Sequence, residues 1–242
     1  MAGGTNSVKA MHYDFKQKLN KIDSQQYRNL RVPEIDWKIN EGLYVFIKRI
    51  AQPRTSTATG FESDTRSIDD IRTLVERNKQ IDVTDVENAE NVVAGILPDD
   101  YMFRVGSRCL AEKDSCIAEI TANIQKHTRD FQNDMFGNSS FEWREVNGLF
   151  VGNTIQLFTD GTFSITKLLL DYIRKPKYIH SAEDAVGGKY KLLDGTELTG
   201  FQNCELPEIV HGDIVDLAVL ITTGDLISDY QAKFSKIQIV DN

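Results

Sequence analysis

The apolar residues of this chain change their spacing at Pro98, from steps of three and four residues to steps of two. Steps of three and four place side chains on one stripe of an α-helix, whereas steps of two place them on one face of a β-strand. The stretch before Pro98 therefore predicts mainly helices, and the stretch after it predicts a sheet. We expect an α+β protein, with amphipathic helices at the N-terminus, a central antiparallel sheet built from hairpins, and helices again at the C-terminus.

Two apolar stripes predict the N-terminal helices. The first consists of Val8, Met11, Phe15, Leu19 and Ile22, and the second of Ile35, Ile39, Leu43, Phe46, Ile47 and Ile50. Pro33 suits the first turn of the second helix, and Pro53 ends that helix. Residues 52–66 are polar and rich in Thr, Ser and Gly, and they predict an exposed arm. Ser67, with Asp70 three residues later, has the pattern of a capping box in front of Ile71, Leu74 and Val75 and predicts a third helix of about three turns. From 79 to 97 the pattern is mixed: Ile81 and Val83 fit a short strand, and residues 92–97 form a short apolar segment.

Two alternating runs after Pro98 predict a β-hairpin. They are Tyr101, Phe103, Val105, Ser107 and Cys109, and then Cys116, Ala118, Ile120, Ala122 and Ile124. A four-residue turn over 111–114 pairs Cys109 with Cys116 and places both apolar faces on the same side of the sheet. This register predicts two small buried thiols rather than a disulfide.

Three Asx-Gly pairs, which favour hairpin turns, divide the rest of the sheet. They are Asn147-Gly148, Asp160-Gly161 and Asp194-Gly195. Farther on, Ile209, Ile214, Leu217, Ala218 and Ile221 predict a helix that ends at Gly224, and Leu226, Ile227, Tyr230 and Phe234 predict a last short helix. The chain thus divides into a helical part over 1–97, an antiparallel β part over 98–203, and C-terminal helices over 204–242 that pack back on the helical part.

Composition and charge exclude several classes of protein. With 40% hydrophobic residues the chain is too apolar to be mostly disordered. No window offers the roughly 18 apolar residues of a membrane helix, and the first residues have no secretory signal. The net charge of −8 argues against affinity for nucleic acid, although an acidic wall lets a DNA duplex slide past. The 3 cysteines fit a reducing compartment.

Two motifs suggest ligand chemistry, and each has a structural alternative. Gly187-Gly188-Lys189 invites comparison with a phosphate-binding loop, but Glu183 stands where that loop needs glycine and Tyr190 where it needs Ser or Thr. The alternative is a turn before a strand. Cys204, His211 and Asp213 flank one apolar turn and form a candidate zinc site. The alternative is that His211 and Asp213 cap a helix, because an acidic residue suits the first turn. The other histidines, His12, His127 and His180, are isolated.

Paired carboxylates are frequent, but their spacing does not predict an active site. The pairs are Asp69 and Asp70, Asp82 and Asp85, Asp99 and Asp100, and Asp213 and Asp216. General acid-base catalysis needs carboxylates that converge in an apolar cleft. We therefore expect no catalytic, cofactor-binding or metal-binding residues, and a protein that is not an enzyme.

Three stretches of the chain resemble a family of viral proteins. They are Leu19-Asn20-Lys21-Ile22-Asp23-Ser24 with Pro33-Glu34-Ile35 and Phe46-Ile47-Lys48; Leu97-Pro98-Asp99-Asp100-Tyr101; and Glu205-Leu206-Pro207-Glu208-Ile209-Val210-His211 followed by Asp213-Ile214-Val215-Asp216-Leu217-Ala218-Val219. Together they resemble structural proteins of crAss-like bacteriophages, which are tailed viruses of gut Bacteroidales. Among these proteins the chain is most similar to a ring protein of the neck, a head-to-tail connector or adaptor.

The resemblance implies a homo-oligomeric ring in the neck or tail region of the virion, assembled in the cytoplasm of the host bacterium. The phage portal protein would lie above the ring, and other neck or tail ring proteins below it. Double-stranded DNA would pass through its channel during packaging and ejection without sequence-specific binding. The resemblance implies no membrane contact and no active-site residues. The arm over 52–66 and the C-terminal tail over 237–242 are then expected to become ordered on binding.

Two alternatives stay open from the sequence. One is another virion component, such as a capsid-associated or cargo protein. The other is a small metal-dependent hydrolase or nuclease that uses Asp99, Asp100, His211 and Asp213.

Overall fold

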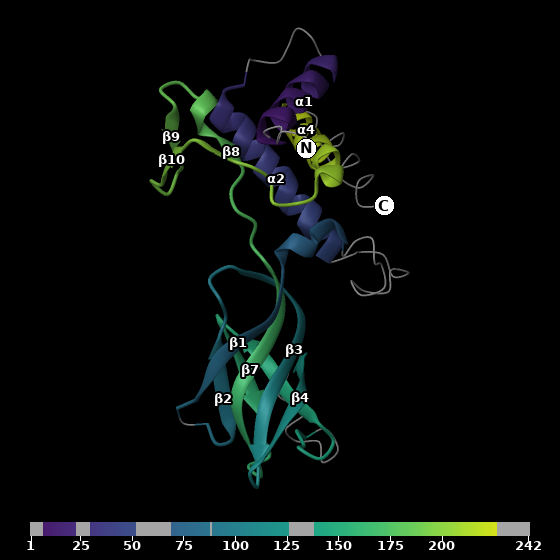
Figure 1. Cartoon of the computed structure of the whole chain (residues 1–242), viewed down its shortest axis with the longest axis vertical. Helices are drawn as coiled ribbons and strands as arrows, with labels where there is room; N and C mark the ends of the chain where they lie inside the picture. The colour runs from purple at the N-terminus through teal and green to yellow at the C-terminus, as the bar shows by residue number, and fades with distance from the viewer. Residues whose placement is uncertain (1–6, 23–29, 52–68, 88, 126–137, 227–242) are drawn as a thin grey trace, which may run out of the picture. The chain divides into compact units, whose positions relative to one another are not determined.

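The structure is a computed structural model that describes residues 7–22, 30–51, 69–87, 89–125 and 138–226 (Figure 1). The chain divides into two units, one formed by residues 75–175 and the other by residues 1–74 and 176–242. We call the first the barrel unit and the second the helical unit. The predicted α+β class is confirmed. The predicted arm over 52–66, the tail over 237–242 and the last short helix after Leu226 lie outside the described residues.

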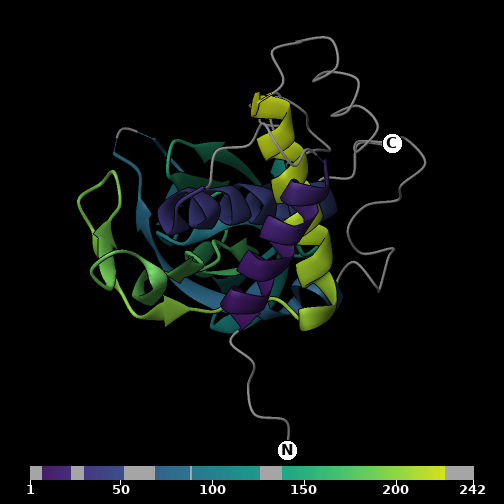
Figure 2. The ribbon, with the colours of Figure 1, turned by 90° about the horizontal axis from the view of Figure 1, so that it is seen from above.

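Three of the described helices build the helical unit. They are α1 (Ser7–Ile22), α2 (Val32–Ala51) and α4 (His211–Leu226). Helix α4 packs against both α1 and α2 (Figure 2). The apolar stripes that predict these helices are buried: Val8, Met11, Phe15 and Leu19 in α1; Ile35, Ile39, Leu43 and Ile47 in α2; and Ile214, Leu217 and Ala218 in α4. The prediction of these three helices is therefore confirmed.

Gly224 does not end the C-terminal helix, so that part of the prediction is wrong. Helix α4 continues to Leu226, and Gly224 is not among the residues with a left-handed backbone. The neighbouring Thr222 and Thr223 are buried. Packing of this last turn outweighs the helix propensity of one glycine, which is only about 1 kcal/mol below that of alanine.

Two small sheets and two 3₁₀ turns after residue 175 also belong to the helical unit. These elements are β8 (His180–Ser181), η4 (Ala182–Asp184), β9 (Lys189–Lys191), β10 (Glu197–Thr199), β11 (Phe201–Gln202) and η5 (Glu208–Val210). Strand β8 pairs with β11, and β9 pairs with β10. Gly195 turns the chain between β9 and β10 with a φ of 88°, so the hairpin at Asp194-Gly195 is confirmed. Gly187 and Gly188 also take positive φ and form a turn before β9, as the alternative to a phosphate loop predicts.

The barrel unit is a closed sheet with the strand order β1-β2-β6-β5-β4-β3-β7. Its strands are β1 (Val75–Asp85), β2 (Val92–Ile96), β3 (Tyr101–Lys113), β4 (Cys116–Gln125), β5 (Glu145–Val151), β6 (Thr154–Phe158) and β7 (Ser164–Arg174). All neighbours run antiparallel except β4 and β5, which run parallel. The core inside the barrel includes Ile81, Cys109, Ile120, Val146, Ile155, Leu157, Leu168 and Tyr172.

The hairpin of β3 and β4 has the predicted inward face but a different register. Cys109 pairs with Ile120 rather than with Cys116, and Lys113 pairs with Cys116. The turn is therefore Asp114-Ser115, whose φ angles of 49° and 66° suit a two-residue hairpin turn. The shift from the predicted pairing is an even number of residues, so the same side chains still face the core. Alternation predicts the buried face, whereas the turn sets the register.

The two thiols of this hairpin differ in exposure, so the prediction of two buried thiols is wrong for Cys116. Cys109 is buried and Cys116 is exposed. Burial raises the pKa of Cys109 to about 12. Because the thiolate is the reactive form, we expect a thiol reagent to label Cys116 quickly in the native protein and Cys109 only after denaturation. Mass mapping of labelled peptides measures this, with Cys116→Ser as the control. Equal labelling of both cysteines in the native protein would contradict it.

The predicted turn at Asn147-Gly148 is also wrong. Both residues lie inside β5, between β4 and β6. A Cβ atom on Gly148 would lie only 2.7 Å from the carbonyl oxygen of Gln156, so the glycine permits close strand packing rather than a turn. The chain turns instead at Gly152, which has a φ of 59°. At Asp160-Gly161 the chain does turn, but β6 and β7 are not neighbours in the barrel and form no hairpin.

The first strand begins where the sequence predicts a third helix. The described helical residues end with η2 (Arg72–Leu74), and Val75 starts β1. The first residues of β1 are mostly exposed and polar, so they carry no alternation. The barrel therefore takes in residues 75–96, which the sequence assigns to the helical part. Residues 176–203, assigned to the β part, belong to the helical unit.

Candidate functional site

A buried carboxylate connects three segments of the helical unit. The side chain of Asp36, on α2, is fully buried. His12 of α1 donates a hydrogen bond from Nε2 to Oδ1 of Asp36 at 2.7 Å. The hydroxyl of Tyr190 on β9 donates to Oδ2 at 2.7 Å, and the backbone N–H of Ser181 donates to the same oxygen at 3.2 Å. These donors compensate a desolvation penalty that amounts to several kcal/mol for a buried ion.

One turn farther along α2, the side chain of Asn40 binds the backbone of Ile179, just before β8. Its Nδ2 donates to the carbonyl oxygens of Ile179 and Asp36, both at 2.7 Å. Its Oδ1 accepts the backbone N–H of Ile179 at 2.9 Å. The side chain thus replaces the strand partner that Ile179 lacks at this point, and it holds the segment that leads into the β9–β10 hairpin against α2.

Burial shifts the pKa of three rings in this region, Tyr178, His180 and Tyr190, toward the neutral form. It raises the pKa of Tyr190, and the hydrogen bond from its hydroxyl to Asp36 raises that pKa further. Burial also raises the pKa of Tyr178 to about 12 and lowers the pKa of His180. The two tyrosines therefore keep their hydroxyl protons at neutral pH, and Tyr190 acts as a hydrogen-bond donor rather than as a base.

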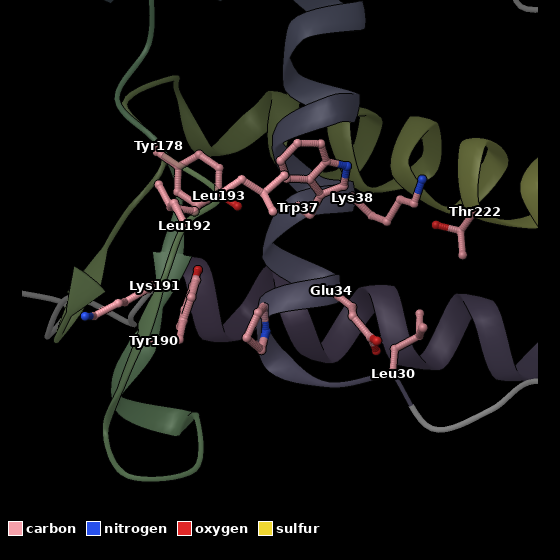
Figure 3. A pocket seen from close by; sticks show the side chains of 11 residues that line it. Leu30, Glu34, Trp37, Lys38, Tyr178, Tyr190, Lys191, Leu192, Leu193 and Thr222 are labelled. Atoms are coloured by element: carbon pink, nitrogen blue, oxygen red, sulfur yellow. The ribbon is translucent and has the colours of Figure 1, made fainter. Parts of the chain in front are cut away.

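An apolar groove of about 470 Å³ lies between α2 and the segment of the β9–β10 hairpin (Figure 3). Its walls include Trp37 of α2, Tyr178, Tyr190 and Leu193 of the hairpin segment, and Thr222 of α4. Trp37 is 51% exposed and Leu193 is 94% exposed. We call this feature the groove. Because the hydroxyl of Tyr190 is bound to Asp36, the buried cluster fixes one wall of the groove.

The charged side chains of the groove are Glu34, Lys38 and Lys191. Glu34 accepts a hydrogen bond from the backbone N–H of Arg31 at 2.8 Å, and Lys38 pairs with Glu41 at 2.9 Å. Lys191 is exposed at the edge. Exposed apolar side chains around a concave surface suit the binding of apolar groups, from a small ligand or from another protein.

Exposed apolar side chains also lie on the barrel unit near the β3–β4 turn, where Cys116 and Ile117, as consecutive residues of β4, point to opposite faces of the strand. Trp143 is 85% exposed and Ile117 is 66% exposed, and Cys116 is exposed beside Ile117. We call these three residues the tip patch. Lys113, the last residue of β3, forms an ion pair of 2.5 Å with Glu142, which precedes Trp143. This ion pair holds the loop that carries Trp143 close to the β3–β4 turn.

Local backbone contacts fix the loop that presents Trp143. Ser140 and Glu145 form a β-bridge across the base of the loop, with N–H to carbonyl distances of 2.8 and 3.1 Å. Arg144 takes a φ of 53° inside it. The ring of Phe141 packs against Phe163 at a centroid distance of 6.0 Å. The exposed tryptophan is therefore presented by an ordered loop.

The candidate ligand residues from the sequence do not converge. Among the described residues, no group of three or more His, Cys, Asp or Glu side chains is placed to hold a metal ion. His211 bonds through Nε2 to the carbonyl oxygen of Leu206 at 3.0 Å, and Asp213 lies in the first turn of α4. Both positions fit the helix-end alternative. Asp99 and Asp100 belong to the barrel unit instead, where Asp100 accepts the hydroxyl of Tyr172 at 2.9 Å. His127 lies outside the described residues.

Sequence reasoning missed both Asp36 and the groove. The signal for Asp36 is its position, since Asp36 and Asn40 are polar residues next to the apolar residues Ile35 and Ile39 of the α2 stripe. A polar residue beside an apolar stripe is expected to be buried only if it has a hydrogen-bond partner, and the sequence does not show that partner. For the groove there is no local signal, because Trp37 and Leu193 come together only through the fold.

Comparisons with known families and with curated proteins identify no relative. No model of a known protein family matches the sequence, and no curated protein matches it significantly. None of the helices in the described part of the chain combines the length and apolarity that a membrane span requires.

Proposed function

We propose that this protein is a structural component of the virion of a crAss-like tailed phage, and that it forms a ring in the neck that connects the portal to the tail. The proposal begins with the resemblance of three stretches, within residues 19–48, 97–101 and 205–219, to structural proteins of these phages. The protein acts by assembly and not as an enzyme.

The observation that carries the proposal is the presence of two different exposed apolar surfaces, one on each unit. The groove presents Trp37 and Leu193, and the tip patch presents Ile117 and Trp143. A cyclic ring with more than two subunits needs such a pair, because each subunit uses one surface toward one neighbour and another surface toward the other. The loss of this apolar area from water provides the driving force for association.

The net charge supports the same role. At −8 it makes the chain repel phosphate. In the proposed ring, an acidic channel lets double-stranded DNA pass without binding it, during both packaging and ejection.

Native mass spectrometry of the purified chain, alone and mixed with the portal protein of such a phage, tests the proposal. We expect a closed ring of many subunits, or one that forms only with the portal. A stable monomer that does not associate with the portal would contradict the proposed function.

Exposed positions allow a matched test of the two surfaces. Trp143→Ser and Leu193→Ser remove exposed side chains, so the fold of each unit is expected to persist while the population of rings falls at least tenfold. The control is Val186→Ser, because Val186 is 102% exposed in the same unit as Leu193 and lies outside the groove. Rings that persist at the control level in both variants would exclude these surfaces from assembly.

A further inference from the structure

We propose that the groove binds residues 227–242 of its own chain, the stretch that follows α4. We call this stretch the post-α4 segment; it lies outside the part of the chain that the structure describes. The inference concerns one copy of the chain and does not depend on the proposed function. A groove that is filled in this way binds another protein only after the segment leaves, so the apparent affinity of any other partner is reduced by the fraction of filled grooves.

Helix α4 runs along α2 toward the groove. Ile214 and Ala218 of α4 approach Gly42 of α2 with their backbones. One turn after Ala218, Thr222 lines the groove together with Lys38, which precedes Gly42 by one turn. Residue numbers therefore rise along α4 as they fall along α2, so the two helices run antiparallel at this contact. The end of α4 is directed toward the start of α2.

The chain thus leaves α4 beside the groove. Helix α4 ends at Leu226, one turn after Thr222, which is about 6 Å along the helix axis. Leu30, just before α2, also lines the groove, and Figure 3 shows Leu30 and Thr222 on the same side of it, away from the hairpin. An extended chain covers about 3.3–3.6 Å per residue, so the first few residues of the post-α4 segment are sufficient to enter the groove.

The post-α4 segment has the apolar side chains that such a groove can bury. Its apolar residues recur at steps of three and four, at Ile227, Tyr230, Phe234 and Ile237. This spacing is the one by which an amphipathic helix places its anchors in an apolar groove. Each aromatic side chain that is buried in such a contact removes about 150–250 Å² from water, which is a large part of the energy of an interface.

The other stretch that adjoins the groove is polar. Residues 23–29 come directly before Leu30, and Tyr27 is their one aromatic residue among Asp, Ser, Gln, Arg and Asn. A stretch of this composition has little apolar surface to bury. The sequence therefore favours the post-α4 segment as the occupant.

Charge does not select the occupant, but the covalent connection does. At the groove, Lys38 is paired with Glu41, and Glu34 offsets the exposed Lys191. The post-α4 segment carries Asp and Lys in equal number. A segment that is joined by a short connection has an effective concentration of about 1 mM. Another copy of the chain reaches this concentration only in a millimolar solution, so in dilute solution each chain fills its own groove.

Disulfide formation in the full chain tests the inference. Leu193→Cys is combined with either Tyr230→Cys or Phe234→Cys, in a Cys116→Ser background that removes the exposed native thiol. Oxidation with copper phenanthroline is expected to give a disulfide within one chain, seen as a monomer of altered mobility on a non-reducing gel and assigned by mass mapping of peptides. The Cα atoms of a disulfide lie within about 7 Å, so the product reports close contact. Val186→Cys in place of Leu193→Cys puts an equally exposed thiol outside the groove and is expected to give at least tenfold less product.

The emission of Trp37 gives a second readout that needs no cross-link. Trp37 lines the groove and is the only tryptophan in a Trp143→Phe background. Replacing Tyr230 and Phe234 together with serine is expected to raise the quenching of Trp37 by acrylamide at least twofold, because the groove loses its occupant. This measurement holds even where a disulfide would require a different register.

The control for quenching is Gln231→Ser with Lys233→Ser, which changes polar residues of the same segment and is expected to leave Trp37 as it is. Three results would overturn the inference: a disulfide that joins two chains, equal yields or no product from Leu193→Cys and Val186→Cys, or quenching that the double serine variant does not change. None of these readouts depends on ring formation. The proposed function can therefore fail in native mass spectrometry while this inference stands, and the reverse.

Discussion

Replacing Asp36 with alanine is expected to lower the free energy of unfolding of the helical unit by about 3 kcal/mol or more, because the loss of this acceptor leaves several donors unsatisfied, at a cost of about 1–3 kcal/mol for each donor that stays buried. The reason lies in the groups that remain. His12, the hydroxyl of Tyr190 and the backbone N–H of Ser181 all donate to this carboxylate. In the variant these donors lose their acceptor, and His12 and the backbone of Ser181 remain buried.

The helical unit can be followed separately because the chain has 2 tryptophans, and each belongs to a different unit. In a Trp143→Phe background, emission of Trp37 reports on the helical unit alone. Urea unfolding curves of this background, with and without Asp36→Ala, give the difference in free energy. Following one unit also avoids treating two units as one cooperative transition.

An exposed aspartate of the same unit provides the control. Asp69 is 72% exposed and lies 3.8 Å from Arg72, so Asp69→Ala is expected to change stability by less than about 0.5 kcal/mol. If Asp36→Ala costs no more than Asp69→Ala, the hydrogen bonds around Asp36 do not support the fold in the way described. The substitution is also expected to weaken binding at the groove, because Tyr190 forms part of both features.

The helices could be predicted because their signal is local. The stripes of α1 and α2 each combine many residues at helical spacing, and their burial needs only one apolar neighbour. Strand β1 has a much weaker local signal, limited to the alternation of Ile81 and Val83. Residues such as Glu76 and Lys79 face solvent. The strand is fixed by its pairing with β7, which is distant in the sequence, and with β2, which follows it after a loop. A capping pattern at Ser67 then predicts a helix where tertiary pairing makes a strand.

Closure of the barrel depends on pairings that no short stretch encodes. Alternation in β3 and β4 predicts two strands with one buried face, and this face is correct. It does not predict that β1 pairs with β7, or that β4 and β5 run parallel. Gly148 in β5 is a second example of a local pattern that misleads. Asn147-Gly148 has the composition of a turn, but the glycine is needed because the carbonyl oxygen of Gln156 on the neighbouring strand lies too close for a side chain.

The groove could not be predicted from short stretches of sequence either. Its residues come from α2, from the hairpin segment and from α4. The sequence shows an exposed hairpin at Asp194-Gly195 and an amphipathic α2, and in the structure the hydrogen bonds of Asp36 and Asn40 help to hold one against the other. Polar residues buried next to an apolar stripe therefore carry more information about the site than its exposed apolar residues do.

The second large effect is expected at the crossing of α2 and α4. A Cβ atom on Gly42 would lie 2.7 Å from the carbonyl oxygen of Ile214 and 2.9 Å from the backbone nitrogen of Ala218. These are backbone atoms, so no side-chain rotation relieves the overlap and the helices must move apart. Gly42→Ala is expected to lower the free energy of unfolding by about 2–3 kcal/mol, within the usual range for overpacked cores.

The matched control is Gly212→Ala on α4, where a Cβ atom would meet nothing within 4 Å. Alanine is the better helix former by about 1 kcal/mol, so this variant is expected to be slightly more stable than the parent. The same urea assay on Trp37 compares the two. Alanine gains helix propensity at both positions, although less at Gly212 because this residue lies in the first turn of α4, and the packing is what opposes the gain at Gly42. Opposite signs would therefore assign the effect at Gly42 to the contact between the helices. A stabilising effect at both positions would mean that α2 and α4 do not cross at Gly42, and the placement of Thr222 beside the groove would be wrong with it.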